Sequence, residues 1–400
     1  MKRVFLHIGA PKTGTTFLQG ILWRNRELLA QDGVLIPYVD ERQHFRSARD
    51  FCGGGWRLLP AEHFTGEWAA VAAATRNWDG STVIITNELL AGSDPDRISS
   101  GLAQLEPAEV HVIFTMRDLA RQLVSDWQEH IKHLHTITLE GFVEALMTDG
   151  IHAQAPFGEM FWGLHDPLRV LPRWGESVPA ERIHVVTGPR PGAAGGELWR
   201  RFASVVGLDP TGYDASARHA NRSLGVNETE LIRRMNLEVA EMPQNVYDPL
   251  VRQYLAREVL GSDSVRLALP PQFLGWATQR SHDMVMGLRT AGYSLSGDWA
   301  DLIPRPEDHR PFVSPTTLTD RDLGGAALRA AVGLLQRAGE QRATLLELNS
   351  EITGQPLPTF TGPTWRARSR RRVNLVRREV VTRLRESRRP RPRADDADLL

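Results

Sequence analysis

The chain has 400 residues, with 48 basic and 48 acidic side chains, 41% hydrophobic residues and a single cysteine, Cys52. This length suffices for a substantial core, while the zero formal net charge offers no global basic field, so any anion site has to be local. One cysteine excludes an internal disulfide framework and a multi-cysteine metal site, and no apolar stretch is long enough for a membrane span or a signal peptide, so we predict a cytoplasmic protein.

The first element that we expect is a strand over residues 4–8, whose apolar run is typical of a central parallel strand. A loop, GAPKTGTT, follows at residues 9–16, and helical spacing of apolar residues begins at Phe17. A glycine turn between a strand and a helix presents backbone N–H groups that can cradle an anion. Lys12 adds a positive charge, and Gly14 permits close approach. The sequence therefore predicts an anion-binding loop here.

Strands and helices then alternate along the chain. We expect further strands at 33–39, 81–88, 110–116 and 182–188, and helices at 17–30, 61–76, 94–105, 119–134 and 195–208. Beyond Asn227 we expect no strands and only helices, at 228–241, 249–260 and 323–348. This alternation predicts an α/β fold with a central, mainly parallel sheet flanked by helices, followed by a C-terminal helical extension. We place the core at 1–225, the extension at 226–350 and a basic tail at 351–400.

The loop departs from the Walker A pattern, which needs a lysine directly after its second glycine. Gly9 and Gly14 have the right separation, but Thr15 stands in the lysine position and Lys12 precedes Gly14 by two residues. The order Pro-Lys-Thr-Gly-Thr-Thr at residues 11–16 resembles the 5′-phosphosulfate loop of sulfotransferases that use 3′-phosphoadenosine 5′-phosphosulfate (PAPS).

That resemblance implies a P-loop NTPase-like sulfotransferase fold with PAPS as co-substrate and no required metal. It places Lys12 against the oxygen that bridges phosphate and sulfuryl group, where a cation stabilises the charge that grows as the sulfuryl group leaves. The loop residues that it implies in binding the 5′-phosphosulfate are Pro11, Lys12, Thr13, Gly14, Thr15 and Thr16.

A second match lies after the strand at 110–116. The same family binds the 3′-phosphate with an arginine that follows a strand and a serine eight residues later, and here Arg117 and Ser125 have that spacing. Leu119 stands where the family usually has proline. From the residues alone, Arg117 could instead be a surface arginine paired with Asp118 or Glu129.

Sulfuryl transfer also needs a base for the acceptor's proton. Glu88 ends the strand at 81–88, at the sheet edge where ligands collect, and it resembles the glutamate in that position of glycan sulfotransferases. A carboxylate that favours a helix N-terminus is the alternative explanation for Glu88. Rival bases are His44, His63, His130 and His133, of which the last two fit a solvated helix face.

The acceptor is not fixed by the sequence. Trp56 is a candidate stacking surface, and Arg218, Arg222 and Ser223 are candidates for a loop over the nucleotide. From Arg366 to Arg393 arginines dominate, with an apolar spacing that would make a basic amphipathic helix on an anionic membrane, although a disordered tail is the simpler interpretation.

These features predict a PAPS-dependent sulfotransferase with Lys12 and Glu88 as its catalytic residues. The acceptor would be a hydroxyl, or less readily an amine, of a carbohydrate, glycolipid or secondary metabolite, and we expect no specific nucleic-acid partner. The alternatives are a P-loop kinase or NTPase, which would depend on magnesium, and a non-catalytic nucleotide-binding protein. The sequence does not indicate an oligomeric state.

Overall fold

The computed structural model describes the chain except residues 56–58, 217–222, 262–263, 306–307, 309–310 and 354–400. It divides into two compact units, Met1–Gly324 and Gly325–Leu400. The sheet and the predicted site residues belong to the first unit. In the second unit the structure describes the greater part of one long helix, α14 (Asp320–Thr353). The basic tail predicted from residue 351 lies almost wholly outside the described residues.

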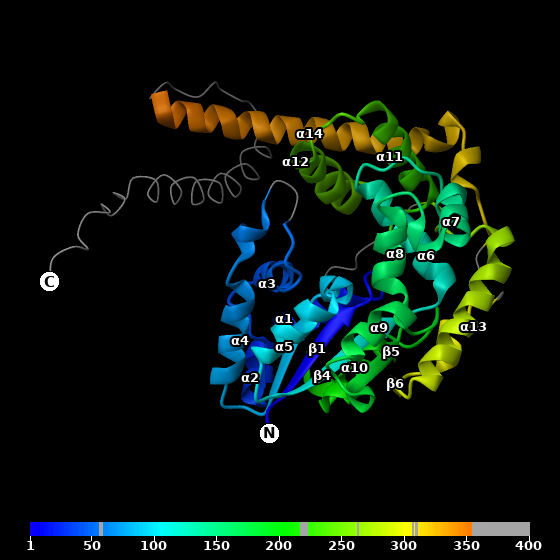
Figure 1. The fold of residues 1–400 in the computed structure, drawn as a ribbon. Coiled ribbons are helices and arrows are strands. Elements are labelled where there is room, and N and C mark those ends of the chain that lie inside the picture. The colour runs from blue at the N-terminus through cyan, green and yellow to red at the C-terminus, as the bar shows by residue number, and fades with distance from the viewer. Residues whose placement is uncertain (56–58, 217–222, 262–263, 306–307, 309–310, 354–400) are drawn as a thin grey trace. The chain divides into compact units, whose positions relative to one another are not determined.

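Six strands of the first unit form one parallel sheet in the order β2-β3-β1-β4-β5-β6 (Figure 1). They are β1 (Arg3–Gly9), β2 (Val34–Leu35), β3 (Thr82–Thr86), β4 (Glu109–Met116), β5 (Ile183–Thr187) and β6 (Ser294–Ser296). Every residue of β3 is buried, as is all of β1 after Arg3, which explains why both read as continuous apolar runs. The predicted α/β fold with a parallel central sheet is confirmed.

The prediction that strands end before Asn227 is wrong. β6 pairs with β5 in parallel, with Leu295 opposite Val185. This strand is three residues long and has serine at both ends, so it carries no apolar run that sequence reasoning could detect. The proposed division at residues 225 and 350 stays a prediction.

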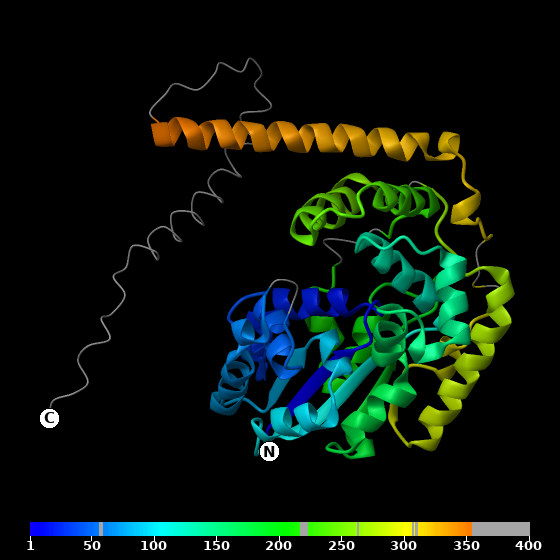
Figure 2. The ribbon, with the colours of Figure 1, turned by 45° about the horizontal axis from the view of Figure 1, so that its top comes forward.

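Helices pack on both faces of the sheet (Figures 1 and 2). Those of the first unit are α1 (Thr15–Arg24), α2 (Arg26–Gln31), α3 (Gln43–Phe51), α4 (Glu67–Asn77), α5 (Pro95–Ala103), α6 (Leu119–Lys132), α7 (Leu139–Thr148), α8 (Phe157–His165), α9 (Pro167–Gly175), α10 (Glu197–Val206), α11 (Val226–Glu238), α12 (Gln244–Tyr247) and α13 (Leu274–Thr290). Three further helical segments bear on the site: the 3-10 helices η2 (Glu88–Gly92) and η8 (Trp299–Leu302), and the π-helix η6 (Asp248–Val259).

The helix expected at 17–30 is interrupted at Asn25. The Asn25 side-chain amide donates to the Ile21 carbonyl at 2.9 Å, while its oxygen accepts from the backbone N–H of Asp214, also at 2.9 Å. An asparagine that bonds its own backbone in this way favours a helix end over a helix interior. The result is two helices, α1 and α2, in place of one.

Aromatic residues join several helices on one side of the sheet. The Phe51 ring of α3 lies 4.6 Å from the Trp68 ring of α4 and stacks at 6.0 Å on the Trp174 ring of α9. The Trp68 indole N–H also donates to the Gly101 carbonyl of α5 at 3.0 Å. Aromatic pairs favour particular ring orientations, so these contacts restrict how α3, α4 and α9 pack against one another.

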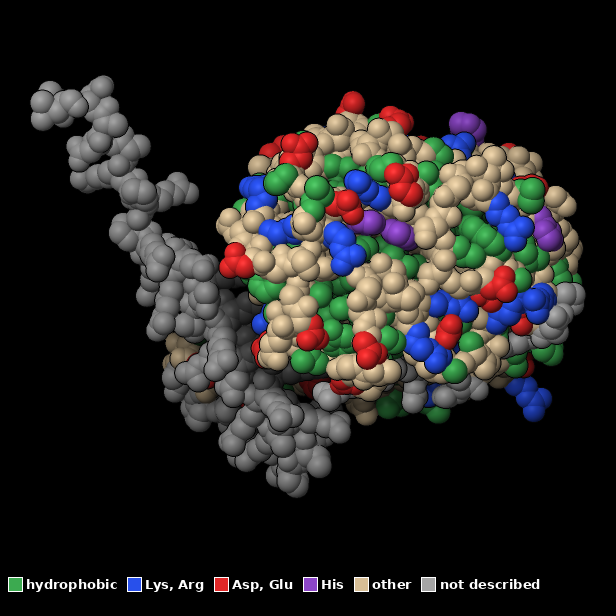
Figure 3. All heavy atoms as spheres, turned by 90° about the horizontal axis from the view of Figure 1, so that it is seen from below, with side chains coloured by type: hydrophobic (Ala, Val, Ile, Leu, Met, Phe, Trp, Pro, Cys, Tyr) green, Lys and Arg blue, Asp and Glu red, His purple; other side chains and the backbone are tan. Residues whose placement is uncertain are grey.

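The surface shows no single dominant charge on the face drawn in Figure 3, where basic and acidic side chains alternate with apolar ones. Within the described residues, none of the helices combines the length and the apolar character that crossing a membrane requires.

Candidate anion-binding site

The loop between β1 and α1 has a backbone that demands glycine at its end. Gly14 has φ 102° and directly precedes α1, and a Cβ atom there would come within 2.4 Å of the Leu198 side chain. Lys12 has φ 63°, a left-handed conformation that residues other than glycine seldom adopt. Strain of this kind is typical of functional loops that the surrounding structure holds in place.

The loop presents a row of free backbone donors. Within the part of the chain that the structure describes, the N–H groups of residues 12–16 have no hydrogen-bond acceptor. These groups lie where a loop enters the first turn of a helix, whose dipole also favours negative charge. Together they form a cradle that suits a phosphate or a sulfate.

A buried chain of hydrogen bonds fixes the start of this loop. The Thr13 hydroxyl lies 2.6 Å from both the Ala10 carbonyl and the Thr115 hydroxyl. Thr115 in turn lies 3.2 Å from Nε2 of His7, whose Nδ1 is 2.8 Å from the Thr86 hydroxyl. Burial lowers the pKa of His7 to about 3, so this ring is neutral near pH 7. The Thr13 hydroxyl is thus used within the protein, where it holds the start of the loop against β4.

Lys12 is paired with a carboxylate on α6. Its ammonium nitrogen lies 2.8 Å from Oε2 of Glu129, and the Lys132 ammonium lies 2.6 Å from the same oxygen. The other oxygen, Oε1, lies 3.4 Å from Nε2 of His133 and 3.8 Å from Nε of Arg252 on η6. The alternative that pairs Arg117 with Glu129 is wrong, because Lys12, Lys132, His133 and Arg252 are the cations around that carboxylate.

The pKa values of this cluster follow from burial and from charge. Burial alone would raise the pKa of Glu129, but the hydrogen bond from His133 and the charges of Lys12 and Lys132 hold it well below its usual range. Burial lowers the pKa of Lys132 to about 8, and repulsion from Lys12 adds to that shift. Glu129 is therefore ionised at neutral pH and is a poor proton acceptor.

Glu88 lies at the other side of the loop, as the first residue of η2 after β3. A Cβ atom placed on Gly9 would be 3.4 Å from Cα of Glu88, so the two backbones are in contact where the loop begins. The Glu88 carboxylate accepts a 3.1 Å hydrogen bond from the Gln19 amide of α1. Its neighbour Asn87, and not Glu88, caps the 3-10 helix by accepting from the Leu89 N–H at 2.9 Å.

The rival histidines are placed differently. His130 is buried, with rings of Phe142 and Phe157 at 5.5 and 4.9 Å, so the solvated-face explanation is wrong for this residue. His133 lies by Glu129. His63 packs against Phe64. His44 on α3 lies near the end of β3, because its carbonyl accepts from the Asn87 amide at 3.1 Å. The structure thus places Glu88 and His44 near the carboxyl end of β3, and His133 beside the carboxylate that pairs with Lys12.

Arg117 follows β4 and is joined to the loop through a side chain that sequence reasoning missed. Its Nε donates to Oε1 of Gln122 at 3.0 Å, and the Gln122 amide donates to the Pro11 carbonyl at 3.0 Å. Its guanidinium also donates to the Arg121 carbonyl at 3.0 Å. Asp118 pairs with Arg121 instead. Burial lowers the pKa of Arg117 to about 10, against the opposing effect of Asp118, so Arg117 stays charged near pH 7.

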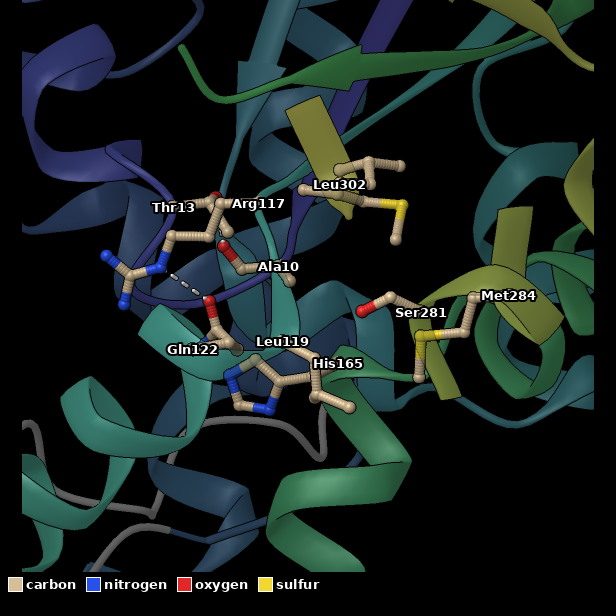
Figure 4. A pocket seen from close by; sticks show the side chains of 10 residues that line it. Ala10, Thr13, Arg117, Leu119, Gln122, His165, Ser281, Met284 and Leu302 are labelled. Carbon is tan, nitrogen blue, oxygen red and sulfur yellow. Dashed lines mark hydrogen bonds between the residues drawn. The ribbon is translucent and has the colours of Figure 1, made fainter. Parts of the chain in front are cut away.

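A small cavity adjoins Arg117 (Figure 4). Thr13 and Gln122 also line it, together with His165 of α8 and Ser281 of α13. Ser125 does not line it and stands partly buried on α6; within the described residues no hydrogen bond connects it to Arg117. The structure therefore joins Arg117 to the loop but leaves the predicted role of Ser125 a prediction.

Some candidates can be placed only in part. Trp56, Arg218 and Arg222 lie outside the described residues, and Ser223 is exposed. Across the described part of the chain, no three His, Cys, Asp or Glu side chains gather in a way that could hold a metal ion.

Comparisons with known proteins add little to this geometry. No model of a known family matches the chain, and no curated protein matches its sequence. Among solved structures, the crystal structure of a sulfotransferase from Alicyclobacillus acidocaldarius matches 63% of this chain and 96% of its own, at 14% identity and a TM-score of 0.37. This neighbour bears the name of the family that the loop resembles. A likeness of this degree carries no weight for function, so we base the proposal below on the chain's own residues.

Proposed function

We propose that this chain is a PAPS-dependent sulfotransferase. The observation that carries the proposal is the loop at residues 12–16, with its unpaired N–H groups, its lysine two residues before Gly14, and Glu88 packed beside its first glycine. The loop suits a phosphate group, and Lys12 in this position suits an oxygen that acquires charge when a sulfuryl group leaves.

In the proposed reaction, the acceptor hydroxyl attacks the sulfur atom in line with the leaving phosphate. The S–O bond to the 5′-phosphate breaks, its electron pair remains on the phosphate oxygen, and Lys12 stabilises that oxygen. Glu88 takes the hydroxyl proton. We assign this role to Glu88 and not to Glu129, because Glu88 accepts a hydrogen bond from the neutral Gln19 amide whereas several cations surround Glu129.

We assign Arg117 to the 3′-phosphate of the nucleotide. It lies at the carboxyl end of β4, next to the loop strand β1 in the sheet, and Gln122 links it to Pro11 of the loop. A guanidinium fork suits a phosphate that has to be held without reacting.

An acceptor screen tests this function. The purified chain is incubated with PAPS and separate pools of carbohydrate, glycolipid and phenolic or alcoholic acceptors, and mass spectrometry detects an added sulfuryl group. We expect transfer to a member of one pool, with formation of 3′-phosphoadenosine 5′-phosphate (PAP), and loss of transfer in Lys12→Ala. If Lys12→Ala transfers as fast as the unaltered chain, the role of Lys12 is wrong.

A further inference from the structure

Lysine is rare in this chain, although basic residues are not. Of 48 basic residues, three are lysines: Lys2, Lys12 and Lys132. Lys12 and Lys132 are far apart in sequence, yet both ammonium groups contact one oxygen of Glu129, at 2.8 and 2.6 Å. Lys2 donates to the Thr75 and Arg76 carbonyls, near the start of β1 and so at the opposite end of the sheet from the loop. Two of the three lysines therefore meet at the candidate anion site.

Lysine and arginine differ in how they can surround a single anionic oxygen. An ammonium is a compact point charge on a flexible stem, so two of them fit around a single oxygen and can follow a ligand as it reacts. A planar guanidinium fork is bulkier and binds two oxygens at once. In a chain that otherwise uses arginine, lysine at both positions fits a site that needs two small, adjacent cations.

We propose that Lys132 is a second cation for the phosphosulfate of the donor, and that Glu129 is a placeholder that keeps Lys12 and Lys132 together until the donor binds. This inference rests on the function proposed above. The phosphosulfate has two anionic groups on either side of one bridging oxygen, so it offers one group to each ammonium. The phosphosulfate carries more negative charge than the single carboxylate of Glu129, so it can compete with Glu129 for the two ammonium groups.

The surroundings of Glu129 agree with a carboxylate that can be displaced. It is partly exposed, with 26% of its side chain accessible, and Lys12 and Lys132 are accessible to 31% and 18%. Arg252 can turn to Asp248, whose Oδ2 is already 3.8 Å from its NH1 nitrogen. Without Glu129 the two ammonium groups would repel each other, so the carboxylate between them stabilises their close approach.

Calorimetric titration of the full chain with two nucleotides tests the role of Lys132. PAP carries a 5′-phosphate for the lysines, whereas adenosine 3′-monophosphate lacks it. In Lys132→Met we expect the affinity for PAP to fall about tenfold or more, as for loss of a charge-assisted hydrogen bond, and that for adenosine 3′-monophosphate to change less than about twofold. Lys2→Met is the matched control and should bind both nucleotides as the unaltered chain does.

The role of Lys132 is wrong if Lys132→Met binds PAP as tightly as the unaltered chain, or loses affinity for both nucleotides alike. Failure of the unaltered chain to bind PAP would instead overturn the proposed function, so the two failures are distinguishable. Lys132→Arg keeps the charge and should retain PAP affinity within about fivefold.

Glu129→Gln tests the placeholder. It removes the competing negative charge and should tighten PAP binding about three- to tenfold at low salt, with a steeper loss as salt increases. A gain in affinity cannot come from a protein that folds poorly. Weaker PAP binding in Glu129→Gln would overturn the placeholder role.

Discussion

The lysine end and the arginine end of the candidate site are built in different ways. At the lysine end, Lys12 and Lys132 are held by a charged group, Glu129, and the loop N–H groups are unpaired. At the arginine end, Arg117 is held by neutral groups, the Gln122 amide and the Arg121 carbonyl. An anion must therefore displace a carboxylate at the first end, but it can join Arg117 without displacing any charge.

This difference suggests different roles for the two ends of the site, catalysis for one and nucleotide binding for the other. A cation that a displaceable carboxylate holds can move toward an oxygen whose negative charge grows during the reaction. Because that charge is largest in the transition state, such a cation stabilises the transition state more than the bound substrate. A guanidinium whose neutral partners fix its position contributes to binding equally before and after reaction. We thus expect the loss of Lys12 to act mainly on kcat, whereas changes at Lys132 and at Arg117 act on nucleotide affinity.

The largest effect is expected for Lys12→Met. Loss of the cation beside the leaving oxygen should lower kcat by about 10³-fold, while the affinity for PAP falls only severalfold. Steady-state transfer rates and calorimetry measure the two quantities, with Lys2→Met as control. If the affinity for PAP fell as much as kcat, Lys12 would serve mainly to bind the nucleotide, and its proposed role in the transition state would be wrong.

Glu88→Gln should lower kcat about 10²-fold or more, because an amide cannot take the acceptor's proton. PAP affinity should not change, since Glu88 bonds Gln19 rather than any cation of the cluster. Glu27→Gln, an exposed change on α2, is the control. If turnover were unchanged in Glu88→Gln, Glu88 would not be the general base, and His44 would be the next candidate.

Arg117→Gln is expected to weaken PAP binding about 10- to 100-fold. Adenosine 5′-monophosphate, which lacks the 3′-phosphate, should bind both proteins alike, in the reverse of the pattern expected for Lys132→Met. Equal losses for the two nucleotides in Arg117→Gln would show that Arg117 supports the fold and does not read the 3′-phosphate.

The smallest effect is a pH dependence at the lysine end. The pKa of Lys132 is lowered to about 8 by burial and by Lys12, against the attraction of Glu129, and Arg257 also lowers it. An anion binds the protonated ammonium, so PAP affinity should be constant between about pH 7 and 8 and should fall above pH 8 by about tenfold in total, as in Lys132→Met. Lys132→Arg should remove this fall, because arginine keeps its proton. A fall of equal slope in Lys132→Arg would assign the titration to another group.

The fold could be predicted from the sequence where a single segment had a clear pattern of apolar residues or glycines. The apolar runs of β1, β3 and β4 predicted the parallel sheet, and the glycine turn predicted the loop that joins β1 to α1. β6 was missed because three residues on a sheet edge have no periodicity, and α13 was missed because its pattern is mixed.

The residues of the candidate site could be proposed from the sequence, but the contacts between them could not. Lys12, Glu88 and Arg117 stand in motifs that follow strands. Gln122 was missed, and Glu129 was considered only as a partner of Arg117, because packing of α6 against the loop makes the contacts that they form. The scarcity of lysine was a signal in the sequence, yet only the structure shows that Lys12 and Lys132 meet.

Competition between two nucleotides tests the central claim most directly. Calorimetric titrations of the unaltered chain compare PAP without metal against ATP with Mg²⁺. We expect PAP to bind at least about tenfold more tightly than ATP with Mg²⁺, and Mg²⁺ not to change its affinity, because the loop has Thr15 where a Walker lysine would stand. Tighter binding of ATP with Mg²⁺ than of PAP would contradict it.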